Sequence, residues 1–257
     1  MDKPLRAINL MPALPHVTHV GPLRALAWLK LGWDDMRHRP GPSIAHGLLL
    51  FMILWLVLLF FSTEIHLLAA AICGYLLVAP VFAAGFYELS RLRASGQPAS
   101  FDASIEGALK NGPRLATLGL VLALLAIVWF WLSGVLFEQG YGGVPPSLND
   151  NLYRTILDWN YAGFFVTYLS VGGMLAVVAF AVSAVSAPMI FDRAAGTGTA
   201  ILTSLKAVAV NPLAMAIWAV LITGLTAIGF ASFLFGLAII LPWLGHATWH
   251  AYRDLID

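Results

Sequence analysis

Five long apolar runs place the strongest constraint on what this chain can fold into. They cover residues 44–61, 66–89, 115–137, 163–191 and 213–252. A transmembrane helix needs about 20 mostly apolar residues, because it rises about 1.5 Å per residue across a hydrocarbon core of about 30 Å. The last run is about twice that length, so we expect it to turn near residues 229–232 and to form spans 213–229 and 233–252. The sequence therefore predicts six transmembrane helices.

The charge content excludes the main soluble classes. Only 11% of the 257 residues are charged, and 14 Lys and Arg against 13 Asp and Glu give a net charge of +1. A soluble domain carries about 25% charged residues, so this chain has too little polar surface for a water-exposed particle and no basic excess for nucleic acid. We expect the lipid bilayer and other membrane proteins as its surroundings, and no nucleic acid as a partner.

The remaining composition limits other possibilities. The single cysteine, Cys73, lies inside an apolar run, so the chain can form neither an intrachain disulfide nor a multi-cysteine metal site. Residues 1–22 are rich in proline and lack the apolar run of about 7–15 residues that a cleavable signal peptide needs. We expect a flexible N-terminal arm over residues 1–22, followed by a six-span membrane domain over residues 23–257.

The distribution of basic residues predicts the orientation. All of the lysines and arginines except Arg154 fall before span one, after span six, or in the connections on that same side. Because short cytoplasmic loops collect Lys and Arg, this asymmetry predicts that both termini are cytoplasmic.

A recurring proline pattern suggests three hairpin repeats. In each repeat a short amphipathic helix precedes a proline that opens a span, and the partner span carries a second proline followed by polar residues. The opening prolines are Pro40, Pro113 and Pro212, and the second prolines are Pro80, Pro188 and Pro242. The polar residues that follow are Glu88 and Arg91, Asp192 and Arg193, and His246, His250 and Arg253. The amphipathic segments, at 26–36, 101–109 and 201–208, either lie in the headgroup plane or cap the bundle.

His246 and His250 are the most specific candidate site. Four residues apart on a helix, they share one face and could bind a metal or haem, with Glu88 as a further ligand if spans two and six meet. Alternatively they lie at headgroup level with Trp243, Trp249 and Tyr252, as interfacial residues do. Glu88 pairs with Arg91 either inside the bundle or at its surface. A bound cofactor is not expected.

Several of these segments resemble one family of prokaryotic integral membrane proteins, the domain of unknown function 2189. The similar segments are residues 87–91 (YELSR), 187–193 (APMIFDR), 200–204, Asn211 with Pro212, and 241–255 (LPWLGHATWHAYRDL). The resemblance implies a six-helix protein of the bacterial inner (cytoplasmic) membrane. Some members are labelled as cytochrome c oxidase subunits. A catalytic haem–copper subunit resembles a twelve-helix bundle with six metal-binding histidines in its spans, whereas most of the seven histidines here lie outside span interiors.

Three functions remain open at this point. The spans lack central charges and the chain lacks a catalytic motif, which favours a non-catalytic accessory or assembly partner of a larger complex, such as a respiratory oxidase. A transporter or channel for a neutral or lipid-like solute would also need no charged site, and the prolines could act as hinges. An enzyme acting on lipid through Glu88, Asp192 and the histidines is the third alternative.

Overall fold

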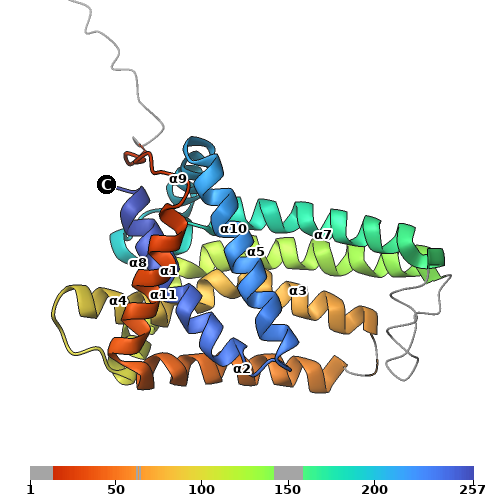
Figure 1. The fold of residues 1–257 in the computed structure, drawn as a ribbon, viewed down its shortest axis with the longest axis horizontal. Helices are drawn as coiled ribbons and strands as arrows, with labels where there is room; N and C mark the ends of the chain where they lie inside the picture. The colour runs from red at the N-terminus through yellow and green to blue at the C-terminus, as the bar shows by residue number, and fades with distance from the viewer. Residues whose placement is uncertain (1–13, 62, 64, 142–158) are drawn as a thin grey trace, which may run out of the picture.

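The described residues fold into helices joined by short connections, and no β-strand is found among them. The computed structural model describes residues 14–61, 63, 65–141 and 159–257. The α-helices are α1 (Arg24–His38), α2 (Pro40–Phe61), α3 (Ile65–Phe82), α4 (Ala84–Ala94), α5 (Phe101–Tyr141), α7 (Ala162–Ser183), α8 (Ser186–Arg193), α9 (Thr197–Val210), α10 (Pro212–Ala231) and α11 (Leu237–Leu255), with a 3-10 turn, η1 (Trp159–Tyr161), before α7. Figure 1 shows α2, α3, α5 and α7 running along the longest axis of the molecule.

Five helical segments are long and apolar enough to cross a membrane. They are Pro40–Phe61, His66–Ala94, Phe101–Gly140, Ala162–Arg193 and Pro212–Ala231. Large apolar side chains cover their outer surfaces, among them Phe60, Leu169 and Val220. Such continuous apolar exposure suits lipid and not water. The chain is therefore an all-α integral membrane protein.

The sixth predicted span is not confirmed. It corresponds to α11, which is not among the five candidate segments and carries Pro242, His246, His250 and Arg253. In Figure 1, α10 and α11 cross the four long helices obliquely, and the connection at 232–236 reaches only part of the way along them. Hydropathy alone cannot distinguish a crossing hairpin from an oblique one, because both bury apolar side chains.

The threefold repeat is not confirmed either. Pro80 lies near the end of α3, Pro188 lies in the first turn of α8, and Pro242 lies inside α11. A proline in the first turn removes no helical hydrogen bond, whereas an interior proline does. Pro113 also differs from its expected role, because α5 continues through it from the amphipathic segment into the span.

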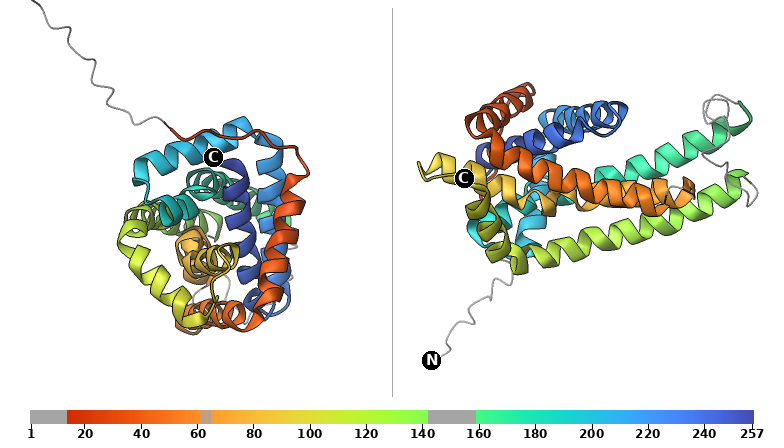
Figure 2. Two further views of the ribbon diagram at one scale, coloured as in Figure 1. Left: turned by 90° about the vertical axis from the view of Figure 1, so that its left-hand side faces the viewer. Right: turned by 90° about the horizontal axis from the view of Figure 1, so that it is seen from below.

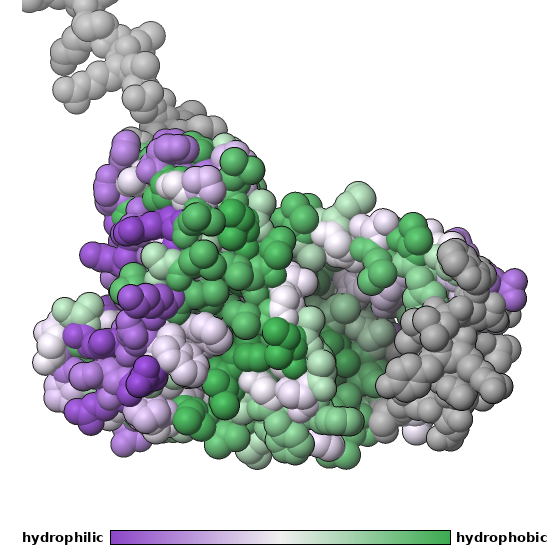
Figure 3. Space-filling view, viewed as in Figure 1, coloured by the Kyte–Doolittle hydropathy of each residue, from purple (hydrophilic) through white to green (hydrophobic). Residues whose placement is uncertain are grey.

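The short helices gather at one end of the bundle, which we call the polar end. It is formed by α1, α4, α8 and α9 together with the C-terminus, and it carries the hydrophilic surface in Figure 3. Seen from this end, α1, α9 and the first part of α5 surround the other helices (Figure 2). Helix α1 packs closely on α11, because a Cβ atom at Gly32 would lie 2.5 Å from the Ala247 nitrogen. The segment 26–36 therefore caps the bundle.

The described part of the N-terminal arm is bound to the C-terminus. Val17 forms an isolated antiparallel bridge with Ile256, and the Thr18 N–H donates to the Leu255 carbonyl at 2.9 Å. Asn211 accepts from the Val20 N–H at 2.8 Å and donates to the Thr18 carbonyl at 3.0 Å. Residues 17–20 of the predicted arm are thus hydrogen-bonded to the rest of the chain, while residues 1–13 lie outside the described chain.

Candidate functional site

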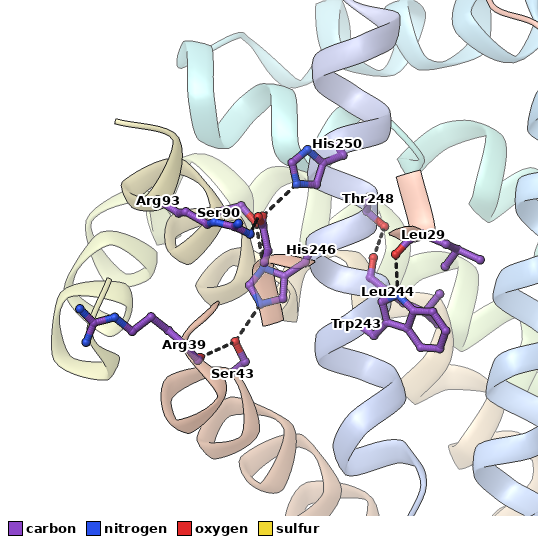
Figure 4. A network of polar contacts seen from close by, with 11 residues as sticks. Leu29, Arg39, Ser43, Ser90, Arg93, Trp243, Leu244, His246, Thr248 and His250 are labelled. Atoms are coloured by element: carbon purple, nitrogen blue, oxygen red, sulfur yellow. Dashed lines mark hydrogen bonds and ion pairs between the residues drawn. The ribbon is translucent and has the colours of Figure 1, made fainter. Parts of the chain in front are cut away.

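Four helices contribute buried polar side chains to one cluster at the polar end. We call it the polar cluster; its members are Asp35 of α1, Ser43 of α2, Ser90 and Arg93 of α4, and His246 and His250 of α11. Figure 4 shows Ser43, Ser90, Arg93 and His250 gathered around the imidazole of His246. Asp35, Ser43, Ser90 and His246 are each less than 10% exposed. Burial of so many polar groups costs free energy unless each finds a hydrogen-bond partner.

Helical spacing positions each pair of cluster residues. His246 and His250 are four residues apart on α11, and Ser90 and Arg93 are three apart on α4, so each pair lies on one face of its helix. Asp35 follows Trp28 by seven residues and shares its buried face of α1. A Cβ atom at Gly245 would overlap the Phe86 ring, so the glycine at this position lets α11 lie against α4.

His246 is held between two hydroxyl groups. Its Nε2 lies 2.9 Å from the Ser43 Oγ and its Nδ1 lies 2.8 Å from the Ser90 Oγ. The Ser90 hydroxyl donates to Asp35 Oδ2 at 2.5 Å, so it must accept at His246. His246 therefore donates from Nδ1 to Ser90. At Nε2 it faces the Ser43 hydroxyl, which also donates to the Arg39 carbonyl at 3.4 Å.

Asp35 accepts hydrogen bonds from two helices. His250 Nε2 lies 2.9 Å from its Oδ2, and Arg93 donates to its Oδ1. Burial on its own would raise the pKa of Asp35, but hydrogen bonds from His250 and Ser90 outweigh burial and lower the pKa below its ordinary value. The carboxylate is thus ionised and joins α1 to α4 and α11.

The cluster does not have the geometry of a catalytic triad. Ser43, His246 and Asp35 are the residue types of a triad, but Ser90 lies between His246 and Asp35. As a result, His246 Nδ1 lies 4.0 Å from Asp35 Oδ2. A base and its orienting acid are typically within about 2.6–3.2 Å. Ser43 is also buried, at 1% exposure.

Glu88 does not join the two histidines. It accepts from Arg91 Nε at 2.7 Å and Nη2 at 2.6 Å, and a Cβ on Gly107 of α5 would touch it at 2.6 Å. Within the described ranges, no three or more His, Cys, Asp or Glu side chains are grouped to hold a metal ion. Of the predicted ligand set of His246, His250 and Glu88, His246 thus has both nitrogens hydrogen-bonded to serines, and Glu88 is paired with Arg91.

The other motif residues fasten the C-terminus. Tyr252 donates its hydroxyl to Asp192 at 2.6 Å, Arg193 donates to the Tyr252 oxygen at 2.7 Å, and Arg253 contacts Asp192 at 3.2 Å. Arg193 also donates to the Ile256 carbonyl at 2.8 Å. The polar residues after Pro188 and Pro242 therefore bind one another and tie α8 to the end of α11.

Sequence reasoning missed Asp35, Ser43 and Ser90. The signal for Asp35 was its position seven residues after Trp28, on the apolar face of the amphipathic segment. Serines near helix ends carry no comparable signal, because most serines satisfy their hydroxyl locally. A second missed pair is His46 and Ser104, whose Nε2 and Oγ lie 2.7 Å apart between Phe86 and Phe101.

Comparison with known proteins finds one family model that matches part of the chain. Residues 67–192 match the model of a family described as a predicted integral membrane protein, DUF2189. The match covers α3 to α8 except for the helix ends, and so includes Glu88, Ser90, Arg91, Arg93 and Asp192, while His246 and His250 lie beyond it. No curated protein and no solved structure matches the chain. Over residues 67–192, the chain is therefore similar to the family of predicted integral membrane proteins DUF2189.

Proposed function

We propose that the protein is a non-catalytic accessory or assembly partner within a larger membrane complex, such as a respiratory oxidase. Support comes from the polar end, where three acidic side chains each form an ion pair with a basic residue. Asp35 joins Arg93 and His250, Glu88 joins Arg91, and Asp192 joins Arg253. The Asp35 and Asp192 pairs join different helices, and the Glu88–Arg91 pair lies within α4, so these charged groups stabilise the helices at the polar end.

The observation that carries the proposal is the exposed face of α7. Ser170, Gly173 and Ala176 lie on this face, and nothing lies within 4 Å of a Cβ built on Gly173. Large apolar residues flank them, with Val166, Leu169, Met174 and Val177 each 66–70% exposed. In membranes, small residues let two helices approach closely, and flanking apolar side chains supply the packing. This face suits a transmembrane helix of another protein.

Site-specific photocrosslinking in native membranes tests the proposal. A photoreactive residue at Val177 of α7 should yield one protein adduct, whereas the same residue at Val220 of α10, equally exposed, should react with lipid. Gly173→Leu should abolish the adduct because its side chain blocks close approach. If Val177 and Val220 both give only lipid adducts, the proposal fails.

A second candidate is the binding or transport of a lipid-like solute. On the face shown in Figure 3, the apolar surface is hollowed beside the α10–α11 hairpin, which suits an acyl chain. Reconstituted vesicles containing a fluorescent lipid analogue test this candidate. Transport faster than in protein-free vesicles would favour it over the accessory function.

A further inference from the structure

A polar cavity opens next to the polar cluster. It lies where the α1–α2 junction meets the connection between α4 and α5, and it has a volume of about 250 Å³. His38, Arg39, Arg93 and Gln97 line it, together with residues 96, 98 and 99. Clefts that hold drug-sized ligands measure about 300–1,000 Å³, so this cavity suits a small group and not a nucleotide.

The lining is cationic. Its lining residues include Arg39, Arg93, His38 and Gln97, and no acidic residue is among them. Arg93 is paired with Asp35. The Arg39 guanidinium has no ion pair with any described residue, and in Figure 4 it points away from His246 with no hydrogen bond drawn from it. An arginine left unpaired beside a second arginine provides a fork of donors for an anion.

A second, smaller cavity lies beside the first, at the polar cluster. This inner cavity of about 10 Å³ shares His38, Arg39 and Arg93 with the outer one and reaches Asp35, Ser43 and His246. That volume has room for about one water molecule. Only the outer cavity therefore has room for a ligand, and the ion pair with Asp35 holds Arg93, which lines it.

The cavity lies at the level where two candidate spans meet the polar end. Arg39 immediately precedes the span Pro40–Phe61, and Arg93 is next to the last residue of the span His66–Ala94. Lipid headgroups begin where the hydrocarbon core ends, and basic pockets at this level bind anionic headgroups.

We propose that this cavity binds a phosphate group, which Arg39 and Arg93 clasp from two sides at the membrane interface. A carboxylate has two oxygens in one plane, whereas a phosphate presents oxygens in three dimensions to donors on both walls. The phosphate is supplied either by the headgroup of an anionic phospholipid or by a free phosphate ion.

Native mass spectrometry of the full chain in detergent tests the site with three probes. They are phosphatidylglycerol, diacylglycerol with the same acyl chains, and inorganic phosphate. We expect phosphatidylglycerol to bind more tightly than diacylglycerol. Arg39→Gln should weaken this binding by about tenfold, while Arg39→Lys, which keeps the charge but loses the fork, should have an intermediate effect.

The matched control is Arg37→Gln. Arg37 is an exposed basic residue two positions away that lines neither cavity, so its loss changes the net charge equally and should leave binding unchanged. Competition by inorganic phosphate would assign the site to free phosphate, and a lack of competition would assign it to the lipid headgroup. Equal binding of diacylglycerol, or equal effects of Arg37→Gln and Arg39→Gln in proteins of equal thermal stability, would overturn the proposal.

Discussion

At the scale of single residues, Asp35 is the acceptor on which the polar cluster depends. Its carboxylate receives hydrogen bonds from Ser90, Arg93 and His250, which belong to two other helices. Removing it leaves these donors without their acceptor in a largely buried site. Breaking a buried ion pair by deleting one partner typically costs about 3–5 kcal/mol.

We expect Asp35→Ala to lower the free energy of unfolding by about 3 kcal/mol. The control is Asp34→Ala, since Asp34 is adjacent, has no ion pair with a described residue, and should change stability by less than about 0.5 kcal/mol. Unfolding in mixed detergent micelles, followed by circular dichroism, measures both. Equal effects of the two variants would show that the cluster does not stabilise the fold.

Asp35 also predicts a pH dependence of stability. Its pKa in the folded protein lies below its ordinary value of 3.8, so the folded state favours the ionised form. This contribution is complete above about pH 4 and is lost as the pH falls through the lower folded-state pKa. Between about pH 4 and pH 3, wild type should lose more stability than Asp35→Asn, in which the contribution is already absent. Parallel thermal unfolding curves for the two proteins across this range would contradict the assignment.

At the scale of helices, the α10–α11 hairpin has an apolar tip. Phe233 and Phe235 are 84% and 66% exposed. A phenylalanine side chain left in water loses the stabilisation of about 1.5–3 kcal/mol that its burial would provide. The tip reaches only part of the way along the four long helices (Figure 1). We infer that the tip ends within lipid and that α10 and α11 enter and leave on the same side.

Cysteine accessibility tests the position of the tip. In a Cys73→Ala background, Phe235→Cys should resist a membrane-impermeant maleimide added to either side of sealed vesicles. Gly163→Cys, at the start of α7 near the opposite end, is exposed with open space around it and should react from one side. Labelling of Cys at position 235 from the same side as position 163 would restore the full six-span arrangement.

The contact between α1 and α11 depends on a glycine. A Cβ at Gly32 would lie 2.5 Å from the backbone nitrogen of Ala247, which cannot move independently of its helix. We expect Gly32→Ala to destabilise the protein by about 1–3 kcal/mol through overpacking. Gly112→Ala, also in a helix but with nothing within 4 Å, should be neutral or stabilising by up to about 1 kcal/mol. The same detergent unfolding measurement compares the two, and a neutral Gly32→Ala would rule out a tight contact.

At the scale of the whole molecule, the described N-terminal segment and the C-terminus meet at the polar end. Val17 pairs with Ile256, and His16 lies 3.0 Å from an Asp257 carboxylate oxygen. The two segments therefore share one side of the membrane. The excess of basic residues predicts that this side is cytoplasmic.

Reporter fusions test this orientation. A reporter that is active only outside the cytoplasm should work when inserted within residues 140–160, where Arg154 lies, and should fail after Asp257. Residues 142–158 are outside the described chain, so this expectation rests on the sequence. Activity of the fusion after Asp257 would place the polar end outside and contradict the predicted topology.

The local sequence was sufficient to predict a helical membrane protein, because hydropathy is a property of each segment by itself. Runs 44–61, 66–89, 115–137 and 163–191 all lie within candidate spans, since an apolar run of that length must satisfy its backbone within a helix in lipid. The pairing of Glu88 with Arg91 could likewise be predicted from the sequence, because residues three apart on a helix are neighbours.

The tertiary structure decided what local spacing could not. Asp35, Ser43, Ser90 and His246 meet only because α1, α2, α4 and α11 converge, and the sequence separations between them carry no information about that convergence. The oblique path of α10 and α11 was equally hidden, because an apolar run of 40 residues is compatible with any hairpin that buries it. Composition determines that these helices avoid water, and packing between helices determines where they lie and which polar groups they bring together.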